Sequence, residues 1–178
     1  MSSATTAQLC RALWLSCCLA IIPLTATASW RNVLPDAELV GQGDLRIWGF
    51  RIYTARLWSA QQPFDSSQPF ALELTYHREI SREEFVDASL DEIRRTSAGQ
   101  VSDSQLQAWR SEMQLAFVDI KEGQRITGVN LAEGCQFYVD GRLQHEVRDP
   151  AFAKAFFAIW FDPKTRDTGL RKQLLGSR

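Results

Sequence analysis

The chain has 178 residues, of which 45% are hydrophobic, with 20 basic and 21 acidic side chains. This length and composition indicate one globular domain that can bury a core of its own. The formal net charge of −1 argues against nucleic acid as a partner, because a domain that binds phosphates carries a basic excess.

The first 28 residues have the features of a secretory signal peptide. Arg11 is their only charged residue, residues 12–24 form an apolar run, and Ala26-Thr27-Ala28 has the small-residue pattern of a cleavage site. The apolar run is shorter than the roughly 20 residues of a membrane-spanning helix. We therefore expect a periplasmic protein of residues 29–178, with no stable membrane insertion after cleavage. The alternative is a protein anchored by an uncleaved signal.

Cys135 is the single cysteine that remains after residues 1–28 are removed, so the mature domain can form no internal disulfide. No histidine or second cysteine lies near it in a metal-binding pattern, and we expect a buried, inert thiol. The sequence indicates no metal site and no cofactor, since it contains neither a phosphate-binding loop nor a histidine-based zinc motif.

A predicted hairpin between Glu38 and Trp58 carries the main candidate site. Trp48-Gly49 separates two runs rich in β-branched and aromatic residues, which indicates a two-residue turn. This turn would pair Asp44 with Tyr53 and make Arg46 and Tyr53 diagonal neighbours on one face of the sheet. Both could then hold one small anion.

The register of this hairpin decides between several possibilities. A turn of odd length would separate Arg46 from Tyr53, and Arg51 could then be the anion ligand. Arg46 could also have a structural role, paired with Asp44 on its own sheet face or with Glu73 on a neighbouring strand.

Further elements follow in chain order, each recognised from its hydrophobic period and its capping or turn residues. They are a loop at 61–69, a strand at 70–78, helices at 82–96 and from 102 to about 118, strands at 124–131 and 135–147 that include a turn at Asp140-Gly141, a helix that opens at Asp149-Pro150, and a last helix at 168–175. Ser81 with Glu84 and Ser102 with Gln105 are capping boxes that predict where two helices begin. Strands and helices do not alternate regularly. The order predicts an α+β fold in which helices cover one face of an antiparallel sheet.

Several motifs along the chain resemble those of bacterial chalcone isomerase-like proteins over residues 36–176. They are G-x-G-x-x-R at 41–46, I-Y-x-A-x-L-W at 52–58, F-Y-x-D-G at 137–141, D-P-x-F-x-x-x-F-F-x-I-W-F at 149–161, and L-R-x-x-L-L-G at 170–176. The resemblance implies an open-faced β-sandwich with a cleft between the sheet and a helical layer. It also implies that Arg46 and Tyr53 match the arginine and tyrosine that hold a carboxylate in fatty-acid-binding members of the family.

Three functions are compatible with these residues. The first is a non-catalytic binder of a fatty acid or similar amphipathic acid, with Arg46, Tyr53 or Arg51 at the carboxylate and with Trp109 and Met113 at the tail. The second is an isomerase or lyase of the chalcone isomerase type, in which Arg46 is the catalytic residue and stabilises an oxyanion. The third is a structural or partner-binding protein with a closed cleft.

Overall fold

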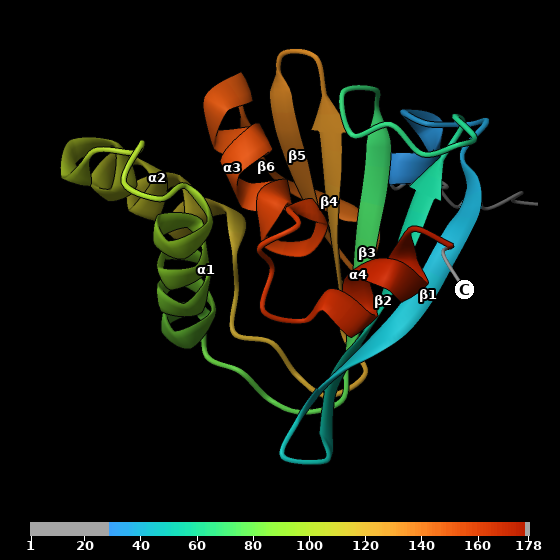
Figure 1. Ribbon diagram of the computed structural model, residues 1–178, viewed down its shortest axis with the longest axis horizontal. Coiled ribbons are helices and arrows are strands. Elements are labelled where there is room, and N and C mark those ends of the chain that lie inside the picture. Colours follow the sequence, from blue (N-terminus) through green and yellow to red (C-terminus); the bar gives the residue numbers. More distant parts are fainter. Residues whose placement is uncertain (1–28, 177–178) are drawn as a thin grey trace, which may run out of the picture.

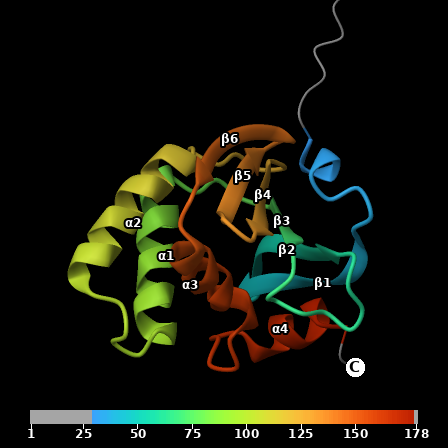
Figure 2. The same cartoon turned by 90° about the horizontal axis from the view of Figure 1, so that it is seen from above.

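The computed structural model describes residues 29–176, in which one six-stranded antiparallel sheet is covered on one face by four helices (Figures 1 and 2). The strands are β1 (Glu38–Ile47), β2 (Phe50–Ser59), β3 (Phe70–Tyr76), β4 (Arg125–Leu131), β5 (Gly134–Val139) and β6 (Arg142–Val147). They lie in the sheet in chain order, from β1 to β6. This arrangement confirms the predicted α+β fold class. The predicted signal peptide lies outside the described residues.

The helices are α1 (Arg82–Thr96), α2 (Asp103–Ala116), α3 (Pro150–Phe161) and α4 (Thr168–Leu174). The first two begin with the predicted capping boxes, Ser81 with Glu84 and Ser102 with Gln105. Asp149 caps α3 through hydrogen bonds from the backbone amides of Ala151 and Phe152. Each cap satisfies backbone donors that the first helical turn leaves without a partner, so local sequence fixes where these helices begin.

Helix α3 lies over the middle of the sheet, between α1 and the strands (Figure 2). Half of its twelve residues are buried, namely Phe152, Ala153, Phe156, Phe157, Trp160 and Phe161. Such burial is the rule for a helix that is apolar nearly all round. The main hydrophobic core is therefore the layer between the inner face of the sheet and the helices.

The outer face of the sheet is covered in part by the segment that precedes β1. Trp30, in a short 3₁₀ helix (Trp30–Asn32), packs with Ala37 on Ala71, Val129 and Tyr138 of the central strands. Arg31 stacks its guanidinium carbon 4.4 Å from the ring centre of Trp30 and 4.3 Å from that of Trp58. A second, smaller hydrophobic cluster thus fixes the start of the domain.

Two hairpins of the sheet have the same tight turn. Trp48 and Gly49, between β1 and β2, have φ angles of 49° and 85°, and Asp140 and Gly141, between β5 and β6, have 48° and 82°. Positive φ at both central positions identifies type I′ turns. The sequence predicted both turns correctly.

No helix among residues 29–176 combines the length and the apolar character that crossing a membrane requires.

Candidate functional site

The predicted pairing of Arg46 with Tyr53 on one face of the sheet is wrong. The two strands pair as expected at the turn, where Arg46 lies opposite Arg51, but one step further Leu45 lies opposite Tyr53. The extra residue, Ile52, forms a β-bulge, and both Ile52 and Tyr53 pack into the main core. Because the bulge interrupts the alternation of side chains, Arg46 and Tyr53 lie on opposite faces.

Arg46 and Arg51 gather around Asp44 on the outer face. The Asp44 carboxylate lies 3.1 Å from a guanidinium nitrogen of Arg46 and 3.8 Å from one of Arg51. The two arginine side chains are 56% and 48% exposed. The structural alternative for Arg46 is therefore the arrangement observed, although Glu73 pairs with Arg56 instead, at 3.6 Å.

Asp44 also accepts a hydrogen bond from the Thr54 hydroxyl at 2.6 Å, and that hydroxyl lies 2.8 Å from Nε2 of His77. Because the single Thr54 proton goes to Asp44, Nε2 of His77 is the donor in the second bond. The Thr54 bond is the main cause that lowers the pKa of Asp44, and the charges of Arg51 and Arg46 add to it. The cluster is a satisfied polar network, with the acid bonded to threonine and not to histidine.

Tyr53 points in the opposite direction, into the core. Its hydroxyl oxygen accepts a hydrogen bond from Nε1 of Trp160 on α3 at 3.0 Å, and its ring meets that of Tyr76 edge-on, with centroids 5.5 Å apart. Burial raises the pKa of both tyrosines well above the ordinary value, so both phenols are neutral. They supply uncharged hydrogen-bonding groups within an otherwise apolar layer.

An internal cavity of about 10 Å³ lies beside Trp160, between the sheet and α3. Its lining is apolar throughout and consists of Leu72, Leu74, Phe85, Ile126, Gly128, Phe137, Phe156, Phe157 and Trp160. A Cβ atom on Gly128 would lie 3.1 Å from the ring of Phe157, so the glycine allows that ring to pack closely on β4. We call this set of residues the aromatic chamber.

Trp109 and Met113, the predicted tail contacts, lie on α2 outside the lining of the chamber. Met113 is fully buried in the main core. Trp109 packs edge-on against Phe152, and its indole donates to the Asp149 carboxylate at 2.8 Å, which joins α2 to the start of α3. Trp109 also borders an open surface groove of about 640 Å³ between α2 and β6, where His145 lies 2.7 Å from Glu112.

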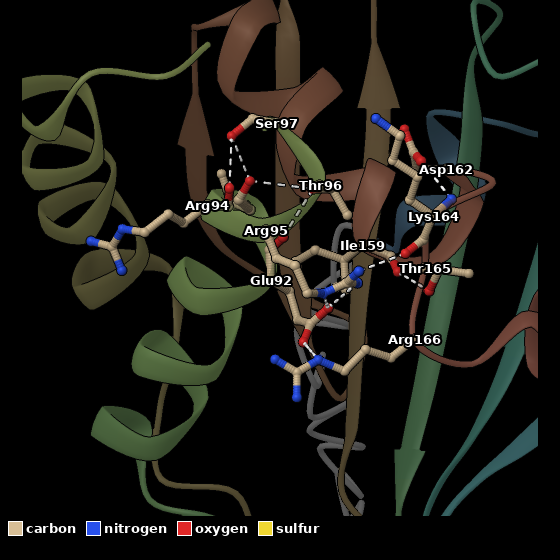
Figure 3. A network of polar contacts seen from close by, with 11 residues as sticks. Glu92, Arg94, Arg95, Thr96, Ser97, Ile159, Asp162, Lys164, Thr165 and Arg166 are labelled. Atoms are coloured by element: carbon tan, nitrogen blue, oxygen red, sulfur yellow. Dashed lines mark hydrogen bonds and ion pairs between the residues drawn. The ribbon is translucent and has the colours of Figure 1, made fainter. Parts of the chain in front are cut away.

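A polar network ties α1 to the loop between α3 and α4 (Figure 3). Glu92 accepts a hydrogen bond from Nε of Arg95 at 3.0 Å and pairs with Arg166, while Arg95 also donates to the Lys164 carbonyl at 2.6 Å. The negative charge of Glu92 is one of the smaller causes that raise the pKa of Tyr53, after burial. The network joins α1 to the segment that follows α3.

The sequence analysis did not select Arg95. Glu92 and Arg95 are three residues apart on α1, a spacing typical of a solvated helix face, and their other partners lie about 70 positions further along the chain. Arg95 is nevertheless only 31% exposed. No arginine or lysine is buried among residues 29–176, and no cluster of metal ligands occurs there. Arg95 is one of several half-buried arginines, together with Arg110 and Arg56.

Residues 38–176 match the sequence family described as chalcone isomerase-like. The chain belongs to the chalcone isomerase-like family. Its fold is similar to the crystal structure of a fatty-acid-binding protein from Arabidopsis thaliana, with a TM-score of 0.62 and 11% sequence identity over 79% of this chain and 87% of that one. At that identity the likeness shows the fold. A comparison with curated protein sequences gave no match.

The motifs of this chalcone isomerase-like chain mainly build its scaffold. A Cβ atom on Gly41 would overlap the backbone of Gln173 and Leu174, and one on Gly43 would lie 2.8 Å from the Leu170 side chain, so both glycines let α4 approach β1. From the middle of α4, Arg171 donates to the Phe161 carbonyl at 2.7 Å. The G-x-G and L-R-x-x-L-L-G motifs thus meet in one helix-to-strand contact.

Proposed function

We propose that this chalcone isomerase-like protein is a non-catalytic binder of a fatty acid or a similar amphipathic carboxylate, held between the sheet and the helices. The observation that carries the proposal is an apolar, phenylalanine-rich chamber beside the Tyr53–Trp160 pair, with a half-buried cation, Arg95, on the helix α1 that packs on α3. Ligand pockets combine mostly apolar walls with a few placed polar groups. The fatty-acid-binding protein of similar fold adds support for this class of ligand.

The carboxylate is assigned to Arg95, not to Arg46. A carboxylate taken out of water requires a charged or hydrogen-bonding partner, and the guanidinium of Arg46 is turned to the outer face. Arg95 is held between Glu92 and the Lys164 carbonyl. A ligand carboxylate would accept hydrogen bonds from some of the guanidinium N–H groups of Arg95, and it could also accept one from the Tyr53 hydroxyl.

Binding requires the helical layer to move, because a cavity of about 10 Å³ accommodates about one water molecule and ligand pockets span roughly 300–1,000 Å³. The contacts from Glu92 and Arg95 to Arg166 and Lys164 hold the loop between α3 and α4 against α1. A ligand that engages Arg95 would replace these contacts and release the loop. The same residues would then admit the tail and hold the carboxylate.

A structural role with a closed cleft is the second candidate, favoured by the filled chamber. An isomerase that depends on Arg46 draws no support from this geometry. The Arg46 side chain lies on the exposed outer face, and its guanidinium is already paired with Asp44.

The test is mass spectrometry of small molecules that co-purify with the protein, followed by calorimetric titration with a long-chain fatty acid. Arg95→Ala should weaken binding by about 10- to 100-fold, the loss of one charge-assisted contact. Arg94→Ala is the matched control, because the neighbouring Arg94 is 57% exposed and pairs with Asp91 on the helix surface. Arg46→Ala should also bind normally. An empty wild-type protein that binds no fatty acid would favour the closed-cleft role.

We further propose export to the periplasm with cleavage after Ala28. Cleavage there would retain Trp30, whose ring anchors the segment before β1 on the outer face. Amino-terminal sequencing of the protein from a periplasmic extract should begin at Ser29. Recovery of the intact chain in the membrane fraction, with Met1 retained, would establish the anchored alternative.

A further inference from the structure

The tip of the β1–β2 hairpin presents three large apolar side chains to solvent. Ile47, Trp48 and Phe50 are 47%, 94% and 72% exposed. The β1–β2 hairpin extends beyond the rest of the domain at the bottom of Figure 1. Single exposed apolar residues are normal, but three together at a protruding tip indicate an interaction surface for an apolar partner.

The backbone at this tip favours a different residue from the one present. Trp48 has a φ of 49°, a left-handed conformation that is unusual for a bulky side chain. The other type I′ turn of this sheet has Asp140 in the corresponding position at nearly the same angle, with Gly141 following as Gly49 follows Trp48. Asparagine, aspartate and glycine are the usual residues there. Turn stability therefore does not account for Trp48.

Two arginines flank the apolar tip. Arg46 and Arg51 lie opposite each other, one on each strand, and within residues 29–176 Asp44 is the single acid paired with them. The group has a net charge of one positive unit with two largely exposed guanidinium groups. Tryptophan prefers the boundary between lipid tails and headgroups, and arginine beside it can reach the phosphates of that layer.

We propose that the β1–β2 hairpin docks reversibly on an anionic phospholipid bilayer, with Trp48 and its apolar neighbours in the interfacial layer and the two arginines on lipid phosphates. Such a bilayer matches both features of the tip, because its interfacial layer accepts the apolar side chains and its phosphates attract the two arginines. The contact is peripheral, since the apolar tip comprises only a few residues. Docking of the hairpin on a bilayer is separate from the proposed binding of a fatty acid, and it does not depend on whether the chamber admits a ligand.

The experiment is flotation of the purified protein with vesicles of phosphatidylcholine alone or mixed with phosphatidylglycerol, with wild type and variants processed identically. Wild-type protein should float with the mixed vesicles, and its tryptophan emission should shift to shorter wavelength. Trp48→Asn should reduce partitioning by about tenfold or more, since it removes a large apolar side chain from the contact. The same change creates Asn-Gly, a favoured sequence for this turn, so the fold is retained.

Paired changes separate the apolar and the electrostatic contributions. Arg46→Gln and Arg51→Gln should each reduce binding to the mixed vesicles by about fivefold and have little effect on phosphatidylcholine alone. Leu143→Asn is the control, because Leu143 is an exposed apolar residue beside the other type I′ turn, 46% accessible, and should bind as wild type does.

Three outcomes would overturn the proposal. One is a wild-type protein that floats with neither kind of vesicle, and another is a Trp48→Asn variant that floats as well as wild type. The third is self-association in analytical ultracentrifugation that disappears in Trp48→Asn without any vesicle binding, because the tip would then be an interface between two copies of the chain.

Discussion

Nε1 of Trp160 donates a hydrogen bond to the Tyr53 hydroxyl oxygen at 3.0 Å, which joins α3 to β2 across 107 positions of the sequence. Both side chains are buried, and the bond lies beside the apolar chamber. A buried donor that loses its acceptor cannot be solvated by water. The contact therefore contributes to the position of α3 on the sheet as well as to stability.

Tyr53→Phe should lower the free energy of unfolding by about 1–3 kcal/mol, the cost of a buried donor left without a partner. Urea denaturation of wild type and variant measures the difference. Tyr138→Phe is the control, since the Tyr138 hydroxyl donates to Gln136 two residues away on the same strand, and Gln136 keeps its bond to Glu146. Equal stability of wild type and Tyr53→Phe would mean that the indole gains another acceptor.

The protein should unfold cooperatively at alkaline pH as its tyrosines ionise. Burial raises the folded-state pKa of Tyr53, Tyr76 and Tyr138 above their ordinary value of 10.0. A raised folded-state pKa means that the stabilising contribution is complete below pH 10 and is lost as the pH rises above it, because only the unfolded chain ionises readily. Phenolate absorbance and circular dichroism, followed together, should change in one step. Phenolate formation near pH 10 in a still-folded protein would contradict this.

The sequence predicted the elements whose signals are local. The caps at Ser81 and Ser102 and the two type I′ turns each depend on residues a few positions apart. The bulge at Ile52 was not predictable in this way, because either register buries an apolar residue, and the packing of Ile52 together with Tyr53 selects between them. One extra residue exchanged the faces of all side chains beyond it.

The shared face predicted for Arg46 and Tyr53 was wrong for the same physical reason. From the sequence alone, Arg46 and Arg51 could be the cations of an anion-binding site. Only the bulge in the hairpin places their side chains on the outer face. Arg95 had no local signal either, since its carbonyl partner at Lys164 is brought to it by the packing of α1 on α3. Contacts between distant elements, which depend on tertiary structure, therefore decide the surroundings of each arginine.

The two glycines that face α4 should differ in their tolerance of a methyl group. Neither has a positive φ, so the effect is one of space alone. Gly43→Ala would press on the side chains of Leu170 and Gln173, which can move, and should cost about 1–3 kcal/mol. Gly41→Ala would press on backbone, including the Leu174 carbonyl oxygen at 2.5 Å, and should cost more. Denaturant unfolding of both variants measures the two losses of stability. A larger loss for Gly43→Ala than for Gly41→Ala would contradict the prediction.

The hydrogen bond from Thr54 should be the main determinant of the low pKa of Asp44, ahead of the two arginines. Thr54→Val keeps the shape of the side chain and removes the donor, so the Asp44 pKa should rise toward its ordinary value of 3.8. Carboxyl-carbon NMR titration measures it. Thr75→Val is the control, because the Thr75 hydroxyl accepts from Arg56 and is not bonded to Asp44.

The same substitution should change how stability depends on pH. A folded-state pKa below the unfolded value means that Asp44 contributes stability above about pH 4, and that this contribution is lost as the pH falls through the folded-state pKa. In Thr54→Val the folded-state pKa of Asp44 comes closer to the unfolded-state pKa. The variant should therefore lose less stability than wild type as the pH falls below about 4. If Arg51→Gln raised the Asp44 pKa more than Thr54→Val did, the charge of the arginine and not the threonine hydroxyl would be the dominant cause.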